Sequence, residues 1–87
     1  MSKFYKILLK ILNGKFDKDL DFSDLIYILE ILDFKKRIRG SHHILTKEGV
    51  AEIINIQPDT NNKSKPYQVK QVRNIILKYK LGEIEYE

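Results

Sequence analysis

The spacing of apolar residues changes along this chain of 87 residues, and that change limits the folds it can adopt. Apolar residues recur every three or four positions over residues 3–13, which predicts an amphipathic helix that ends at Gly14. A second apolar run at helical spacing follows Ser23, a good N-cap residue, and predicts a helix over residues 23–33. The chain is therefore expected to begin with two helices.

The middle of the chain has the short apolar segments of β-structure. Residues 34–39 and 42–47 are joined by Gly40-Ser41, a pair of turn-forming residues, and this arrangement predicts an antiparallel hairpin. Three isoleucines within residues 52–57 predict a third strand. The three strands are expected to form one antiparallel sheet.

A loop and a last helix follow the strands. The polar stretch 59–65 predicts an exposed loop, and Pro66 suits the first turn of a helix whose apolar stripe reaches Gly82. The predicted fold is α+β, a three-stranded antiparallel sheet with helices packed on one face and the other face open. We expect a single domain over residues 1–87, with a frayed tail at 82–87.

Charge is unevenly distributed along the sequence. The formal net charge is +4, but residues 34–80 hold eleven Lys and Arg against three Asp and Glu. Such a basic block is typical of a chain that binds a polyanion, with nucleic acid as the first candidate, although a solvated surface can have the same composition.

Composition also bears on where the protein works. There is no cysteine, so no disulfide or thiolate metal site supplements the core, and the sequence is compatible with a reducing cytoplasm. No apolar run has the roughly 20 residues needed to cross a bilayer, and lysines interrupt the first apolar stretch. We therefore expect a cytoplasmic protein without a membrane span or a signal peptide.

The two histidines of the chain are the candidates for chemistry. His42 and His43 are adjacent on the predicted second strand, so their side chains should lie on opposite faces of the sheet, and the sequence leaves open which face is buried. A histidine among cations can remove the proton of an RNA 2′-hydroxyl at neutral pH without a metal. The alternative is a histidine with a purely structural or surface role.

Metal and cofactor chemistry find little support in the sequence. Adjacent strand residues cannot easily chelate one ion, no other His or Cys completes a zinc site, and no Gly-rich phosphate loop is present, so we expect neither a metal nor a cofactor. Ser41 can either shape the turn or contact a phosphate.

Residues 34–45, which include Gly40-Ser41-His42-His43 after an apolar helix, resemble the core of the HicA family of mRNA interferase toxins. Residues 65–73 are similar to the closing helix of one branch of that family, and the resemblance covers about residues 23–81. It implies a fold like the double-stranded-RNA-binding domain, cofactor-free cleavage of mRNA, and neutralisation by a HicB antitoxin. The family's catalytic histidine follows Gly-Ser-x, a position that is His43 here.

The chain departs from the family pattern in two places. Residues 1–22 precede the usual first helix, and the helix predicted there could cover the core or mediate assembly. Many relatives carry a further histidine near the third strand, whereas residues 55–59 hold none. If a second group protonates the leaving 5′-oxygen, it must be a Lys, an Arg or water.

The leading hypothesis is an endoribonuclease with His43 as the general base. Gly40 and Ser41 are expected to shape the turn or contact a phosphate, and the other expected RNA contacts are Arg37, Arg39, Lys47, Lys70 and Arg73. One alternative is a noncatalytic RNA-binding module in which the histidines only stack or form hydrogen bonds. Another is a domain whose positive face docks an acidic protein.

Overall fold

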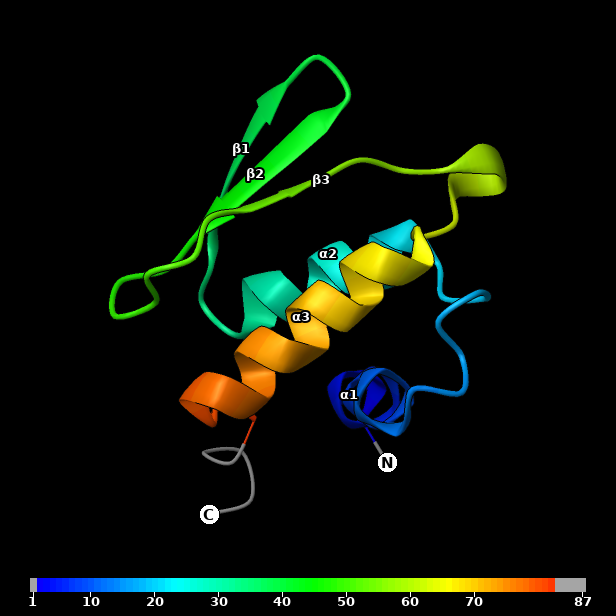
Figure 1. Ribbon diagram of the computed structural model, residues 1–87, viewed down its shortest axis with the longest axis horizontal. Helices are drawn as coiled ribbons and strands as arrows, with labels where there is room; N and C mark the ends of the chain where they lie inside the picture. Colours follow the sequence, from blue (N-terminus) through cyan, green and yellow to red (C-terminus); the bar gives the residue numbers. More distant parts are fainter. Residues whose placement is uncertain (1, 83–87) are drawn as a thin grey trace.

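The computed structural model describes residues 2–82 and has α+β architecture (Figure 1). Three helices and one three-stranded antiparallel sheet are present, as the apolar pattern predicted. The elements are α1 (Lys3–Asn13), α2 (Phe22–Ile31), β1 (Lys35–Arg39), β2 (His42–Thr46), β3 (Ile54–Ile56), the 3₁₀ turn η1 (Thr60–Asn62) and α3 (Pro66–Tyr79).

The predicted first helix is confirmed at both of its ends. Ser2 caps α1 by accepting a hydrogen bond from the Tyr5 amide at 3.2 Å, and Gly14 ends it with a left-handed φ of +80°. Helix α1 packs against α2 and α3 through Phe4, Ile7, Leu8 and Ile11, all of which are buried. Helix α1 therefore covers the core, which is one of the two roles left open for this segment.

The predicted cap of the second helix was wrong. Helix α2 begins at Phe22 with Asp21 at the N-cap position, so Ser23 lies within the first turn. The chain is held extended up to Asp21 because residues 63 and 64 pair with it, through an Asp21–Lys63 bridge and a 2.8 Å bond from the Ser64 amide to the Leu20 carbonyl. The helix ends at Ile31, two residues earlier than predicted.

The predicted hairpin is confirmed. Arg39 pairs with His42 across a two-residue turn, in which Gly40 has a φ of +61°. A positive φ at the first central residue alone fits a type II′ turn, which favours glycine there. Strand β3 is shorter than predicted, Ile54–Ile56, and pairs with β2 to give the order β1-β2-β3.

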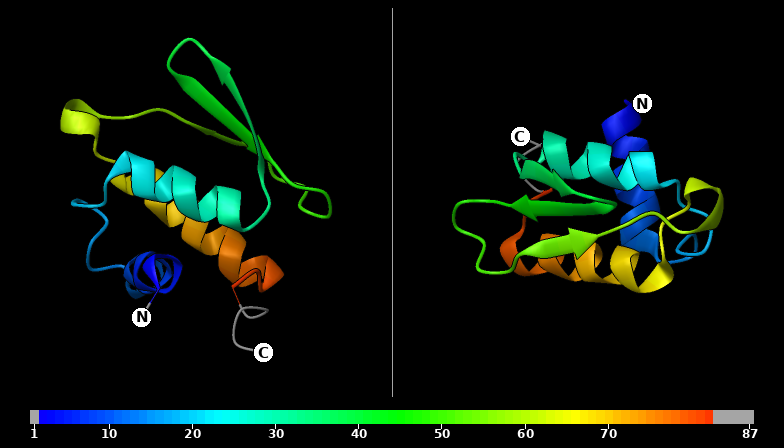
Figure 2. Two further views of the ribbon diagram at one scale, coloured as in Figure 1. Left: turned by 180° about the vertical axis from the view of Figure 1, so that it is seen from behind. Right: turned by 90° about the horizontal axis from the view of Figure 1, so that it is seen from above.

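The sheet covers one side of the helices. In Figure 1 and in the left view of Figure 2, α2 and α3 lie on the same side of the sheet, and α1 lies on the far side of these two helices. Leu45, Ile54 and Ile56 are fully buried on the helix-facing side of the sheet, whereas Thr46 and Asn55 alternate with them and are exposed. One face of the sheet thus meets the core and the other is open to solvent.

The stretch predicted as an exposed loop is partly ordered and partly buried. It contains η1, Ser64 is only 2% exposed, and Lys63 binds Asp21 and Asp19 at 2.8 and 3.2 Å. The prediction failed because the acidic partners and the Leu20 carbonyl that order this stretch lie more than 40 residues earlier in the chain. Pro66 starts α3 as predicted, and residues 83–87 lie outside the described part of the chain.

Candidate functional site

The two histidines lie on opposite faces of the sheet, as strand alternation required. His43 pairs with Ile38 on β1 and with Ile56 on β3, and directly paired residues share a face. Because Ile56 is fully buried, His43 belongs to the helix-facing side, where it is half-buried at the margin of the core. His42 pairs with Arg39 and belongs to the open side.

Two contacts hold the imidazole ring of His43. Its Nδ1 lies 3.2 Å from the Ser41 carbonyl oxygen, and its ring meets the ring of Phe22 edge-on, with the centroids 5.0 Å apart. A carbonyl can only accept, so Nδ1 must carry a proton and the neutral ring must keep its lone pair on Nε2. No residue among 2–82 has a hydrogen bond to Nε2, which leaves this atom able to accept a proton.

The environment of His42 differs from that of His43. His42 Nδ1 lies 3.0 Å from Asn55 Oδ1, and the side-chain amide can turn to present either an oxygen or a nitrogen. Its tautomer is therefore not restricted by a backbone carbonyl. Only His43 is held in the neutral tautomer that a base acting through Nε2 needs.

His43 lines a groove between α2 and the hairpin, which we call the His43 groove. The residues that line it are Phe22, Ser23, Ile26, Glu30, His43 and Asn62. Glu30, one of these lining residues, forms an ion pair with Lys36, in which Oε2 and Nζ are 3.5 Å apart. Lys36 pairs with Leu45 and so shares the face of His43, which makes it the β1 cation on that side of the sheet.

Hydrogen bonds of Ser41 hold the Gly40-Ser41 turn in place. The Ser41 hydroxyl donates to Gln57 Oε1 at 3.0 Å, and the Ser41 carbonyl accepts from His43. Gly40 is exposed, and an added Cβ would meet no atom within 4 Å. Gly40 and Ser41 therefore shape the turn and orient His43, and both remain accessible to a ligand.

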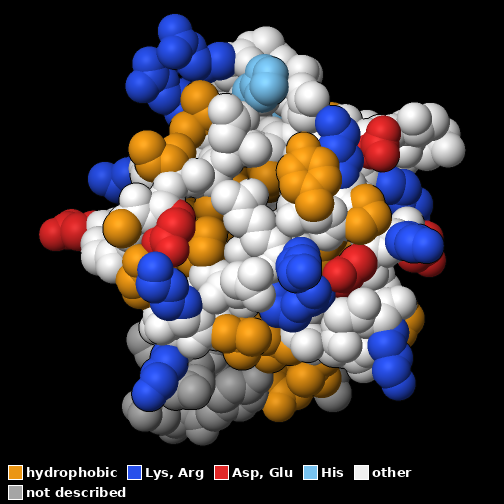
Figure 3. All heavy atoms as spheres, in the orientation of Figure 1, with side chains coloured by type: hydrophobic (Ala, Val, Ile, Leu, Met, Phe, Trp, Pro, Cys, Tyr) orange, Lys and Arg blue, Asp and Glu red, His pale blue; other side chains and the backbone are white. Residues whose placement is uncertain are grey.

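The remaining β1 cations lie on the other side of the sheet from His43. We call this side the outer sheet face, and its residues are Lys35, Arg37, Arg39, His42, Ile44, Thr46 and Asn55. Arg37 and Arg39, both expected as RNA contacts, are thus separated from His43 by the sheet. In Figure 3, Lys and Arg side chains gather at the top of the molecule, over the hairpin.

The other predicted contacts are spread over the molecule. Lys47 follows β2 four residues beyond His43, about 13 Å along the strand direction, and shares a recess with Asp33 and Glu48. Lys70 is exposed on α3. Neither residue is brought to the His43 groove.

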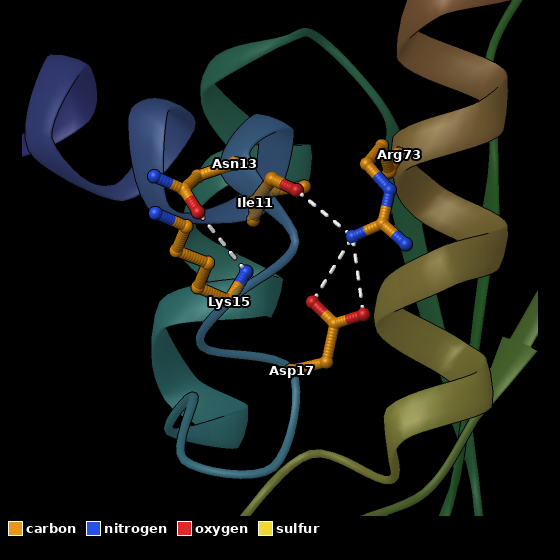
Figure 4. A network of polar contacts seen from close by, with 5 residues as sticks. All are labelled: Ile11, Asn13, Lys15, Asp17 and Arg73. Atoms are coloured by element: carbon orange, nitrogen blue, oxygen red, sulfur yellow. Dashed lines mark hydrogen bonds and ion pairs between the residues drawn. The ribbon is translucent and has the colours of Figure 1, made fainter.

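Arg73 has a different partner from the one expected. Its Nη1 donates to the Ile11 carbonyl at 3.1 Å and to the two Asp17 oxygens at 3.0 and 3.1 Å, which joins α3 to the end of α1 and the loop after it (Figure 4). Only 17% of its side chain is exposed. Arg73 therefore has a structural role, and its guanidinium is bound to an internal carboxylate rather than left free for a phosphate.

Sequence reasoning missed Phe22 and Lys36 as neighbours of His43. Lys36 could have been found, because a two-residue turn at Gly40-Ser41 fixes the pairing of β1 with β2 and so the face of each residue. Phe22 precedes His43 by 21 positions and belongs to a helix, so no local pattern connects the two.

Comparison of the chain with protein-family models, with curated proteins and with solved structures finds no match. Within residues 2–82, none of the helices has both the length and the apolar character required to cross a membrane.

Proposed function

We propose that this chain is an endoribonuclease in which His43 Nε2 is the general base. We also propose that it is the toxin of a toxin–antitoxin pair, cleaves mRNA in the cytoplasm without a metal or cofactor, and is neutralised by a HicB-like protein. The toxin assignment is supported by the resemblance of residues 34–45 and 65–73 to HicA toxins. The cleavage is supported chiefly by one observation, the bond between His43 Nδ1 and the Ser41 carbonyl.

The proposed reaction needs only one proton acceptor to begin. His43 Nε2 removes the proton of an RNA 2′-hydroxyl, and the 2′-oxygen attacks the adjacent phosphorus. A bond forms between the 2′-oxygen and phosphorus while the bond to the 5′-oxygen breaks, which leaves a 2′,3′-cyclic phosphate and a 5′-hydroxyl end. The leaving 5′-oxygen takes up a proton from a lysine or from water.

Lys36 is the cation best placed to serve this reaction. It lies on the face of His43, and its ion pair with Glu30 is half-exposed, so an RNA phosphate can compete for its ammonium group. A positive charge beside the phosphate stabilises the charge that grows on its oxygens in the transition state. Lys36 therefore replaces Arg37 and Arg39 as the expected cation at the scissile phosphate.

The test compares two single variants, His43→Ala and His42→Ala, with the wild type. We expect His43→Ala to lower the rate of RNA cleavage by about 10²- to 10⁴-fold and to abolish growth arrest when the chain is induced in bacteria. His42→Ala, the matched control, should retain the wild-type rate constant of cleavage at saturating RNA, where any effect on binding is removed, and a chelator should leave the wild-type rate unchanged. Circular dichroism checks that both variants fold. Undiminished mRNA cleavage by a folded His43→Ala variant would contradict the proposal.

A second candidate is a noncatalytic RNA-binding module. It is favoured by the position of Arg37 and Arg39 on the opposite side of the sheet from His43, because a binding surface needs no base beside it. Long incubation of RNA with the wild-type protein separates the candidates. Binding with intact RNA at every salt concentration would favour the module over the enzyme.

A further inference from the structure

The outer sheet face is basic and contains no acidic residue on its strands. Of its seven residues, three are cations, and the other four are His42, Ile44, Thr46 and Asn55. Two acidic side chains lie at one end of it, where Asp33 and Glu48 share a recess with Lys35. The rest of the face therefore presents positive charge without a compensating carboxylate.

The three cations of this face are also unpaired. Lys35, Arg37 and Arg39 have no ion pair or side-chain hydrogen bond among residues 2–82. Four other cations of the described chain are bound to carboxylates, namely Lys36, Lys63, Arg73 and Lys78. The basic groups of the outer sheet face are thus available for an external anion.

The spacing of these cations fits the backbone of one nucleic-acid strand. They alternate along a single strand, so neighbours lie about 6.8 Å apart in a straight row, which is similar to the separation of successive phosphates in an extended chain. A guanidinium can bind a phosphate through two parallel hydrogen bonds. A recess beside the row offers some apolar surface, from Ile44 and Ile53, to a ribose or a base; its lining residues are Lys35, Lys36, Arg37, Ile44, Thr46 and Ile53.

We propose that the outer sheet face binds single-stranded RNA through its sugar-phosphate backbone. The inference rests on RNA being a partner of this chain, but not on cleavage by His43, which lies on the other side of the sheet. The hairpin extends beyond the helices, so a strand can reach this face without a helix in its path (Figure 1). Backbone contacts carry no base information, so binding is independent of sequence.

The test uses a fluorescent RNA of 12 nucleotides with 2′-O-methyl groups, which cannot be cleaved by attack of the 2′-oxygen. Its affinity is measured by anisotropy over a range of salt for the wild type, for Arg37→Gln/Arg39→Gln and for the control Lys6→Gln/Lys18→Gln. Both double variants lose two exposed positive charges. We expect the arginine pair to weaken binding about 10- to 100-fold and to lower the salt slope by about 1.4. The control should change the affinity by less than about twofold.

Several outcomes would overturn the proposal. Equal losses in the two double variants would mean that only net charge matters, and tighter binding of duplex RNA would exclude a single strand as the ligand. Competition by polyglutamate as strong as by RNA of equal charge would assign the face to an acidic protein. Cleavage of unmodified RNA, measured in parallel, reports on the proposed function separately.

Discussion

Removal of the Asp17 carboxylate should destabilise the protein far more than removal of the neighbouring Asp19 carboxylate. Asp17 accepts two hydrogen bonds from Arg73 Nη1, at 3.0 and 3.1 Å, and its side chain is 19% exposed. In Asp17→Ala the guanidinium of Arg73, itself 17% exposed, keeps only the Ile11 carbonyl as an acceptor. A positive charge is then left half-satisfied between α1 and α3.

The expected loss is about 2 kcal/mol. Breaking a fully buried ion pair costs about 3–5 kcal/mol, an exposed pair contributes about 0–1 kcal/mol, and this pair lies between these limits. In a domain of this size each kcal/mol shifts the melting temperature by roughly 4–8 °C, so Asp17→Ala should melt about 8–16 °C below the wild type. A typical domain has a free energy of unfolding of about 5–15 kcal/mol, so the variant should remain folded after this loss.

Asp19→Ala is the matched control in urea unfolding and thermal melts. Asp19 contacts Lys63 at 3.2 Å, but its side chain is 80% exposed and Lys63 keeps its bond to Asp21, so we expect a loss below about 1 kcal/mol. Unfolding free energies of the two variants within about 0.5 kcal/mol of each other would refute the reasoning.

Two further predictions concern pH and the turn. Hydrogen bonds from Lys78 and Tyr79 lower the pKa of Glu52 from 4.5 to about 2, so its stabilising effect is complete above about pH 4.5 and is lost as the pH falls toward 2. The difference in urea midpoint between wild type and Glu52→Gln should vanish over that range, and a constant difference would refute it. Gly40→Ala should cost about 1 kcal/mol because φ is +61°, whereas Ser41→Ala should cost less in the same urea assay.

Much of the local structure could be predicted from the sequence. The ends of α1, the Gly40-Ser41 hairpin and the Pro66 start of α3 depend on periodicity, glycine and proline, which act within a few residues of themselves. The start of α2 could not be predicted from the sequence, because Asp21 is held extended by pairing with Lys63. Local signals favoured Ser23 as the cap, and the distant pairing decided otherwise.

Some features of the candidate site could likewise be predicted from the sequence, and others could not. The alternation of a strand already placed His42 and His43 on opposite faces, and the charge pattern already marked residues 34–80 as basic. The two-residue turn also implied that Arg37 and Arg39 lie opposite His43. Only the tertiary structure decided that the side of His43 is the one that meets the helices and Phe22, and that Arg73 is bound to Asp17. The sequence carries the period of each element, but which face is buried depends on contacts between residues far apart in the chain.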